Sequence, residues 1–159
     1  MKTIIVLLIS VCSLTIQAQT DPGSFKWKKF SKSLNTHIEW GENHFQEQLD
    51  LENRNEINGM PMDKEPLYGS ASNFIETAAY VSYYRYSFET EADAKVFFEE
   101  LGNILKKALG EDFQVNAGER DINAEHTNEA GDHCTVQAYM EGTNITISIQ
   151  PPINKPIPY

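Results

Sequence analysis

TAAYVSYYRYSFETEADAKVFFEELGNILKKAL, residues 77–109, joins a strand-like pattern directly to a helix-like pattern and decides the fold class. Its first part, residues 77–88, is rich in aromatic and β-branched side chains and contains neither glycine nor proline. Such a composition favours a long β-strand. We therefore expect a sheet and at least one helix that follows a strand of that sheet along the chain.

The second part of this segment predicts an amphipathic helix over Glu91–Leu109. Thr90 is placed to cap its N-terminus, Asp93 lies in its first turn, and Gly110 is expected to end it. We expect the apolar face of this helix to be buried, with Leu101 at its centre. The residues of that face recur at helical spacing and are Ala94, Phe97, Phe98, Leu101, Ile104, Leu105, Ala108 and Leu109.

Two further strands are predicted near the C-terminus, over residues 134–141 and Asn144–Gln150. Gly142-Thr143 between them suits a tight hairpin turn. In the last strand isoleucines alternate with threonine and serine, so one face should be buried and the other wet. The pieces form a β-α-β-β unit. They predict an α+β fold in which an antiparallel sheet of about four strands carries one principal helix on one face.

The N-terminal third carries weaker patterns. Residues 25–30 and 37–40 are expected to form short strands, because their apolar and aromatic residues come in short runs. Residues 44–51 fit either an amphipathic helix or a strand. Residues 53–69 contain an Asn-Gly pair and two prolines, and we predict a long loop there.

Residues 1–18 have the character of a secretory signal peptide. Lys2 supplies the positive start, a short apolar run follows, and Ala18 is the small residue that a signal peptidase requires. This run is shorter than the roughly 20 residues that span a bilayer, and no later segment approaches that length. We predict cleavage near Ala18 and a secreted or periplasmic protein without a transmembrane segment. Cys12 offers a lipoprotein alternative, which the bulky Val11 before it disfavours.

The rest of the chain has the length of one domain. We expect a single α+β domain over residues 19–150 and an extended, proline-rich tail over residues 151–159. Only Cys134 would remain after signal cleavage, so no intrachain disulfide is expected. Cys134 is predicted to be a buried, inert thiol, with a reactive thiol or an intermolecular disulfide as the alternatives.

The chain is strongly acidic, with a formal net charge of −10 at pH 7. A negative field repels phosphate backbones and anionic lipid surfaces. We therefore do not expect nucleic acid as a partner.

Sequence motifs of nucleophilic catalysis and phosphate binding are absent. His133 directly precedes Cys134, but neighbouring residues of a strand point to opposite faces and cannot act as a pair. Residues 121–125 begin like a calcium loop, but His126 then stands where the sharp turn requires glycine. The histidines form two pairs, each separated by seven residues with acids nearby: His37 with His44, and His126 with His133. Neither spacing is typical of a zinc site, so we expect polar, exposed histidines, no metal and no cofactor.

Residues 77–88 also carry a row of tyrosines on one face of the predicted strand. Tyr80, Tyr84 and Tyr86 occupy even positions, opposite Ala79 and Val81, which we place under the helix. Accessible phenols can stack on a sugar ring or a peptide and hydrogen-bond it, so we predict that these three tyrosines bind a ligand. The alternative is a second core layer, in which aromatic residues of the N-terminal third cover this face: Trp27, Phe30 and Trp40.

Together these observations favour a small exported, non-enzymatic binding or interaction domain whose ligand is an unknown protein or glycan. A small secreted metal-dependent hydrolase that uses the histidines and nearby acids is one alternative. An accessory subunit of an exported complex is another.

Overall fold

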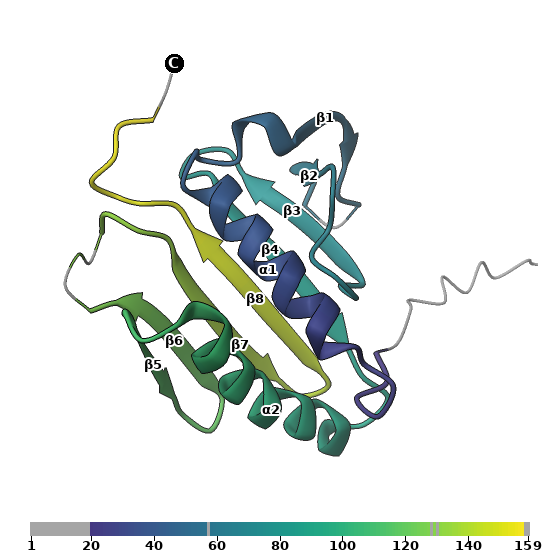
Figure 1. Cartoon of the computed structure of the whole chain (residues 1–159). Coiled ribbons are helices and arrows are strands. Elements are labelled where there is room, and N and C mark those ends of the chain that lie inside the picture. The colour runs from purple at the N-terminus through teal and green to yellow at the C-terminus, as the bar shows by residue number, and fades with distance from the viewer. Residues whose placement is uncertain (1–19, 57, 128, 130, 158–159) are drawn as a thin grey trace, which may run out of the picture.

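The computed structural model describes residues 20–56, 58–127, 129 and 131–157 (Figure 1). The predicted signal peptide, with Cys12 and the cleavage site, lies outside the described residues. The described elements follow one another as α1 (Trp27–Gly41), the 3₁₀ helix η1 (Gln46–Gln48), β1 (Leu49–Arg54), β2 (Pro61–Asp63), β3 (Ser72–Glu76), β4 (Val81–Ser87), α2 (Glu91–Leu109), β5 (Phe113–Ala117), β6 (Asp121–His126), β7 (Thr135–Glu141) and β8 (Asn144–Gln150).

The main sheet has the strand order β3-β4-β8-β7-β6-β5, and every neighbouring pair is antiparallel. The elements of the predicted β-α-β-β unit are present as β4, α2, β7 and β8, but β5 and β6, which were not predicted, lie between α2 and β7 along the chain. The α+β class is confirmed. The predicted numbers of elements, about four strands and one principal helix, are too low. Within the described residues the main sheet has six strands, β1 and β2 form a second antiparallel sheet, and there are two α-helices.

Both α-helices lie on the same face of the main sheet, where they also contact each other (Figure 1). The core fills the layer between the helices and the sheet. Its largest fully buried side chains include Phe30 and Leu34 from α1, Phe97, Leu101 and Leu105 from α2, Tyr84 and Tyr86 from β4, and Ile145 and Ile147 from β8.

Helix α2 has the predicted bounds, because local signals specify both of its ends. The side-chain oxygen of Thr90 accepts a hydrogen bond from the backbone amide of Asp93 at 3.1 Å. Gly110 follows the last helical residue with φ of +82°, a backbone angle that favours glycine. Leu101 is fully buried, as expected.

Helix α1 corrects the prediction of short strands at residues 25–30 and 37–40. Phe30, Leu34, His37 and Gly41 are its buried residues, and their spacing is helical. The polar and aromatic residues between them hide this pattern, and two of its buried positions are a histidine and a glycine. Gly41 is required by packing, since a Cβ atom there would lie 2.6 Å from the sulfur of Cys134.

The sequence patterns did not predict several other strands. Residues 44–51, which fitted either a helix or a strand, contain η1 and the start of β1. The segment 53–69, which was predicted to be a loop, contains the end of β1 and all of β2. Residues 121–125, considered as a calcium loop, lie in β6, where Ile122 and Ala124 alternate into the core. Strand backbones pair with their neighbours, so this segment cannot wrap around an ion. β5 and β6 are short and largely polar, which weakens the alternation that marks a strand.

Candidate functional site

The row of tyrosines predicted to bind a ligand is a core layer rather than an accessible surface. Tyr84 and Tyr86 are both 0% exposed. The ring of Phe30 lies 6.4 Å from that of Tyr86, and the ring of His37 lies 5.1 Å from that of Tyr84. Tyr80 lies in the turn before β4 with φ of +54° and is partly buried. The prediction of an accessible face is wrong because both helices cover it. Parts of α1 were expected to be strand, and α2 was expected on the opposite face, under which Ala79 and Val81 were placed, but its Phe97 ring lies 5.4 Å from that of Tyr86.

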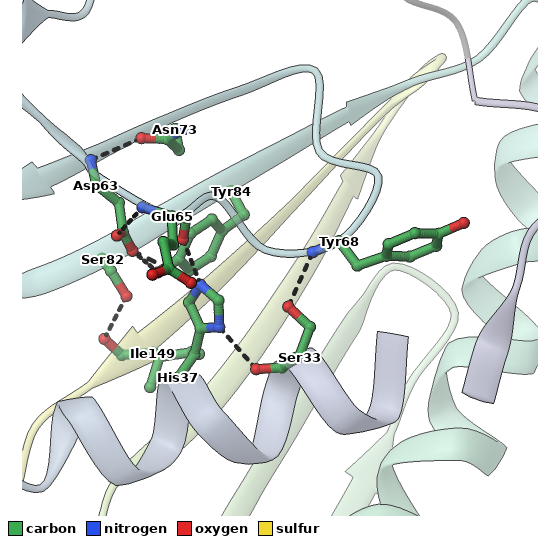
Figure 2. Close-up of polar contacts among 9 residues, drawn as sticks. All are labelled: Ser33, His37, Asp63, Glu65, Tyr68, Asn73, Ser82, Tyr84 and Ile149. Carbon is green, nitrogen blue, oxygen red and sulfur yellow. Dashed lines mark hydrogen bonds and ion pairs between the residues drawn. The ribbon is translucent and has the colours of Figure 1, made fainter. Parts of the chain in front are cut away.

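Tyr84 belongs to a buried polar network between α1 and the sheets (Figure 2). Its hydroxyl donates to Oδ2 of Asp63 at 2.6 Å, and Oδ1 of Asp63 accepts from the amide of Glu65 at 3.0 Å. The amide of Asp63 donates to the side-chain oxygen of Asn73 at 2.8 Å. Through these bonds the end of β2 is tied to β3 and β4.

His37 connects α1 to the same network. Its Nδ1 lies 2.7 Å from the carbonyl oxygen of Ser33, and its Nε2 lies 2.8 Å from that of Glu65 (Figure 2). Both partners are carbonyl oxygens, so a ring nitrogen that carries a hydrogen donates to its partner. Oδ2 of Asp63 lies 3.7 Å from Nε2.

Burial raises the pKa of Asp63, although Tyr84, the amide of Glu65 and His37 all favour the ionised form. Burial and the neighbouring Asp63 raise the pKa of Tyr84, so its hydroxyl remains a donor. His37 and Asp63 are 2% and 3% exposed, and both nitrogens of the ring already face carbonyl oxygens. No nitrogen is free to take a proton from a substrate, which makes the network a packing element rather than a catalytic dyad.

The opposite face of the main sheet carries a different set of side chains. Both described α-helices pack on the tyrosine face, so the odd residues of β4, Tyr83 and Arg85, point away from them. Phe74 pairs with Tyr83 across β3 and β4, and the two rings are stacked with centroids 4.7 Å apart. On β7 the side chain of Tyr139 is 54% exposed on this same face. We call this surface the open face.

The strand register arranges the open face in rows. Tyr83 of β4 is opposite Ser148 of β8, which is opposite Gln137 of β7. In the next row Arg85 is opposite Thr146. A hollow of about 180 Å³ adjoins the aromatic end of these rows and is lined by Asn55, Asn58, Ser72, Phe74, Tyr83, Arg85 and Thr146. Partial burial and the carboxylate of Glu76 raise the pKa of Tyr83, so its hydroxyl stays protonated and donates to Glu76 at 3.4 Å.

The four histidines separate into two groups. His37 and His44 are buried in the α1 region and do not form a pair, which contradicts the expectation of exposed histidines there. His126 and His133 remain partly exposed, and their rings stack with centroids 4.5 Å apart. With Glu129 they place three potential metal-ligand atoms within 4.8 Å of one another. No metal site was expected from the sequence. These three ligand atoms lie close together because β6 pairs with β7.

Cys134 is buried and unpaired among the described residues, as predicted. Its sulfur lies 3.5 Å from the carbonyl oxygen of Ile38 in α1. Burial, followed by the carboxylate of Glu42, raises the pKa of the thiol. These contacts favour an inert thiol and separate its chemistry from that of the neighbouring His133.

Comparisons with protein-family models, with curated proteins and with solved structures found no match. Among the described residues, no helix combines the length and the apolar character that crossing a membrane requires.

Proposed function

We propose that this protein is an exported, non-enzymatic binding domain that holds a saccharide on the open face of its main sheet. The observation that carries the proposal is the stacked Phe74–Tyr83 pair beside Arg85 and a hollow whose remaining lining is amide and hydroxyl side chains. The proposal keeps the binding function expected from sequence and moves it from the tyrosine face to the opposite face.

The chemistry of this surface suits a sugar ring. An aromatic side chain offers a flat apolar surface to the C–H groups of a pyranose, while hydroxyl and amide groups exchange hydrogen bonds with its hydroxyls. Arg85 adds planar donors in a fixed geometry, and it is exposed. A mixed wall of aromatic and convergent polar groups is typical of small-molecule sites.

The charge of the protein narrows the class of ligand. With a formal net charge of −10, the chain repels polyanions over a long range. Neutral saccharides do not experience this repulsion. We therefore favour a neutral glycan over an acidic polysaccharide, and the export expected from residues 1–18 would bring the domain into contact with such glycans.

Screening the labelled protein on a glycan array tests the proposal, with isothermal titration of any glycan that binds. Tyr83→Ala and Arg85→Ala should each weaken binding by about tenfold or more, which corresponds to about 1.4 kcal/mol. Arg120→Ala is the matched control, because Arg120 is exposed but lies outside the hollow, in a salt bridge with Glu91. Circular dichroism checks the fold of each variant.

Two results contradict the proposal. The first is an array on which no glycan is bound. The second is glycan binding that Tyr83→Ala and Arg85→Ala leave unchanged, or that Arg120→Ala weakens equally.

A further inference from the structure

His126, Glu129 and His133 meet at the end of the β6–β7 pair. His126 is the last residue of β6, and His133 comes shortly before β7. Ala124 is opposite Val136 in this antiparallel pair, so the two ends of the connecting segment return to the same place. The register thereby brings together two imidazoles and one carboxylate from the segment that connects β6 to β7.

Hydrogen bonds already link the residues of the cluster. The backbone amide of Glu129 donates to Nδ1 of His126 at 3.1 Å, so a metal ion would bind His126 through Nε2 or in place of this hydrogen bond. Nε2 of His133 lies 2.8 Å from the Oε2 atom of Glu129. Imidazole nitrogen and carboxylate oxygen both ligate zinc, and a metal ion can replace the hydrogen that Nε2 of His133 shares with Glu129.

Glu42 orients His133 from the other side of the ring. Its Oε1 atom lies 3.4 Å from Nδ1 of His133. The same oxygen accepts from the amide of Cys134 at 3.0 Å, and Lys155 pairs with the other carboxylate oxygen. A carboxylate that holds one nitrogen of a histidine while the other nitrogen faces a ligand site is the usual outer arrangement of histidine metal centres.

We propose that His126, Glu129 and His133 form a surface site for a divalent transition-metal ion of the Zn²⁺ class, with Glu42 as the carboxylate that positions His133. Ligand atoms around tetrahedral zinc lie about 3.3 to 3.5 Å apart, given bonds of about 2.0 to 2.1 Å. The three donors lie within 4.8 Å of one another, so side-chain shifts of about 1 to 1.5 Å would close the site. Glu129 is exposed and the histidines are partly exposed, which allows those shifts and leaves the remaining positions to water.

The donor set also selects the class of ion. Imidazole nitrogen suits zinc, copper and nickel, whereas Ca²⁺ and Mg²⁺ prefer oxygen ligands. The site should therefore bind Zn²⁺ far more tightly than Ca²⁺. It is distinct from the open face and does not rest on saccharide binding.

Isothermal titration of the purified protein with ZnCl₂ tests the site. We expect one Zn²⁺ per chain, a loss of at least tenfold in affinity for His126→Ala, Glu129→Gln and His133→Ala, and about 10- to 100-fold for Glu42→Gln. Asp132→Asn is the matched control, because Asp132 is an exposed acid next to His133 that is not part of the donor group. Circular dichroism of the substituted proteins separates lost ligands from lost folding.

Three outcomes would overturn the proposal: no zinc uptake, affinity that His133→Ala leaves unchanged, or an equal loss in Asp132→Asn. A fourth contradicting result would be that equimolar CaCl₂ displaces Zn²⁺ from the protein, because carboxylates alone would then account for the binding. If a histidine variant does not fold, the Glu129→Gln variant carries the test, since Glu129 is exposed and its replacement leaves the core intact.

Discussion

Replacing Tyr84 by phenylalanine tests whether the buried network stabilises the junction between the two sheets. The change removes one oxygen and leaves the ring, so core packing is preserved. What is lost is the 2.6 Å hydrogen bond from the hydroxyl to Oδ2 of Asp63. Asp63 is 3% exposed, so water cannot readily replace the missing donor.

Tyr86→Phe is the matched control for this substitution. Tyr86 is also 0% exposed and lies on the same strand face, but its hydroxyl donates to an uncharged acceptor, the carbonyl oxygen of Tyr68, at 3.0 Å. Hydrogen bonds to charged groups contribute about 1.5 to 3 kcal/mol, and neutral ones about 0.5 to 1.5 kcal/mol. We expect Tyr84→Phe to lower the free energy of unfolding by about 2 kcal/mol and Tyr86→Phe by about 1 kcal/mol.

Urea unfolding at pH 7, followed by tryptophan fluorescence and by circular dichroism, measures both values. With a denaturant slope of about 2 kcal/mol per molar, Tyr84→Phe should lower the midpoint by about 1 M. A double-mutant cycle with Asp63→Asn then measures the part of the coupling that depends on the carboxylate charge, because an asparagine oxygen can still accept from Tyr84. Equal losses for the two tyrosine variants, or a cycle without coupling, would refute the assignment of a charge-assisted bond.

Leu101→Ala should lower the free energy of unfolding by about 2 to 5 kcal/mol, because the side chain is fully buried at the centre of α2; an unchanged melting temperature would contradict this packing. Gly41→Ala should lower the urea midpoint although alanine favours helices, because the added Cβ atom meets the sulfur of Cys134 at 2.6 Å. Gly23→Ala is the control, because its added Cβ atom would lie 3.4 Å from Oδ1 of Asp21 and should leave the midpoint nearly unchanged. Burial raises the pKa of Asp63, so its contribution to stability is present below the pKa of the unfolded state and is lost as the pH rises through the folded value. The advantage of the wild type over Asp63→Asn in urea unfolding should therefore decrease as the pH rises above about 4, the ordinary pKa of an aspartate; an advantage that increases over that range would contradict the prediction. Cys134 should react with a thiol reagent only after denaturation, since burial raises the pKa of its thiol and shields the sulfur; rapid labelling of the native protein would show an open site.

The candidate sites could be anticipated only in part. The alternation of residues 77–88 correctly separates Tyr84 and Tyr86 from Tyr83 and Arg85. It does not reveal which set is covered, because both faces carry tyrosine. The signal that decides the question lies in α1, where Phe30 and Leu34 recur at helical spacing. That pattern is weak because the buried positions after them are His37 and Gly41, which do not mark an apolar face.

The histidine cluster illustrates the same limit. Sequence spacing places His126 and His133 too far apart for one turn of a helix, and metal-site rules based on spacing exclude them. They meet because β6 and β7 are antiparallel neighbours, as shown by the pairing of Ala124 with Val136. The sequence showed the pair His126 and His133 with acids nearby, but β6 was not expected, so the sequence did not show that the pair converges.

Local interactions explain what the sequence determined by itself: α2 with Thr90 and Gly110 at its ends, the β7–β8 hairpin, the burial of Leu101 and Cys134, and the α+β class. Caps, turns and regular periodicity involve residues within a few positions of one another, and their free energies favour one structure before any distant contact forms. Only the tertiary structure decided the position of α1, the covering of Tyr84 and Tyr86, the hydrogen bonds of His37 beside Asp63 and the meeting of His126 with His133. Each of these features depends on the free energy of burying or pairing groups from separate elements. The sequence of one segment alone therefore cannot predict it.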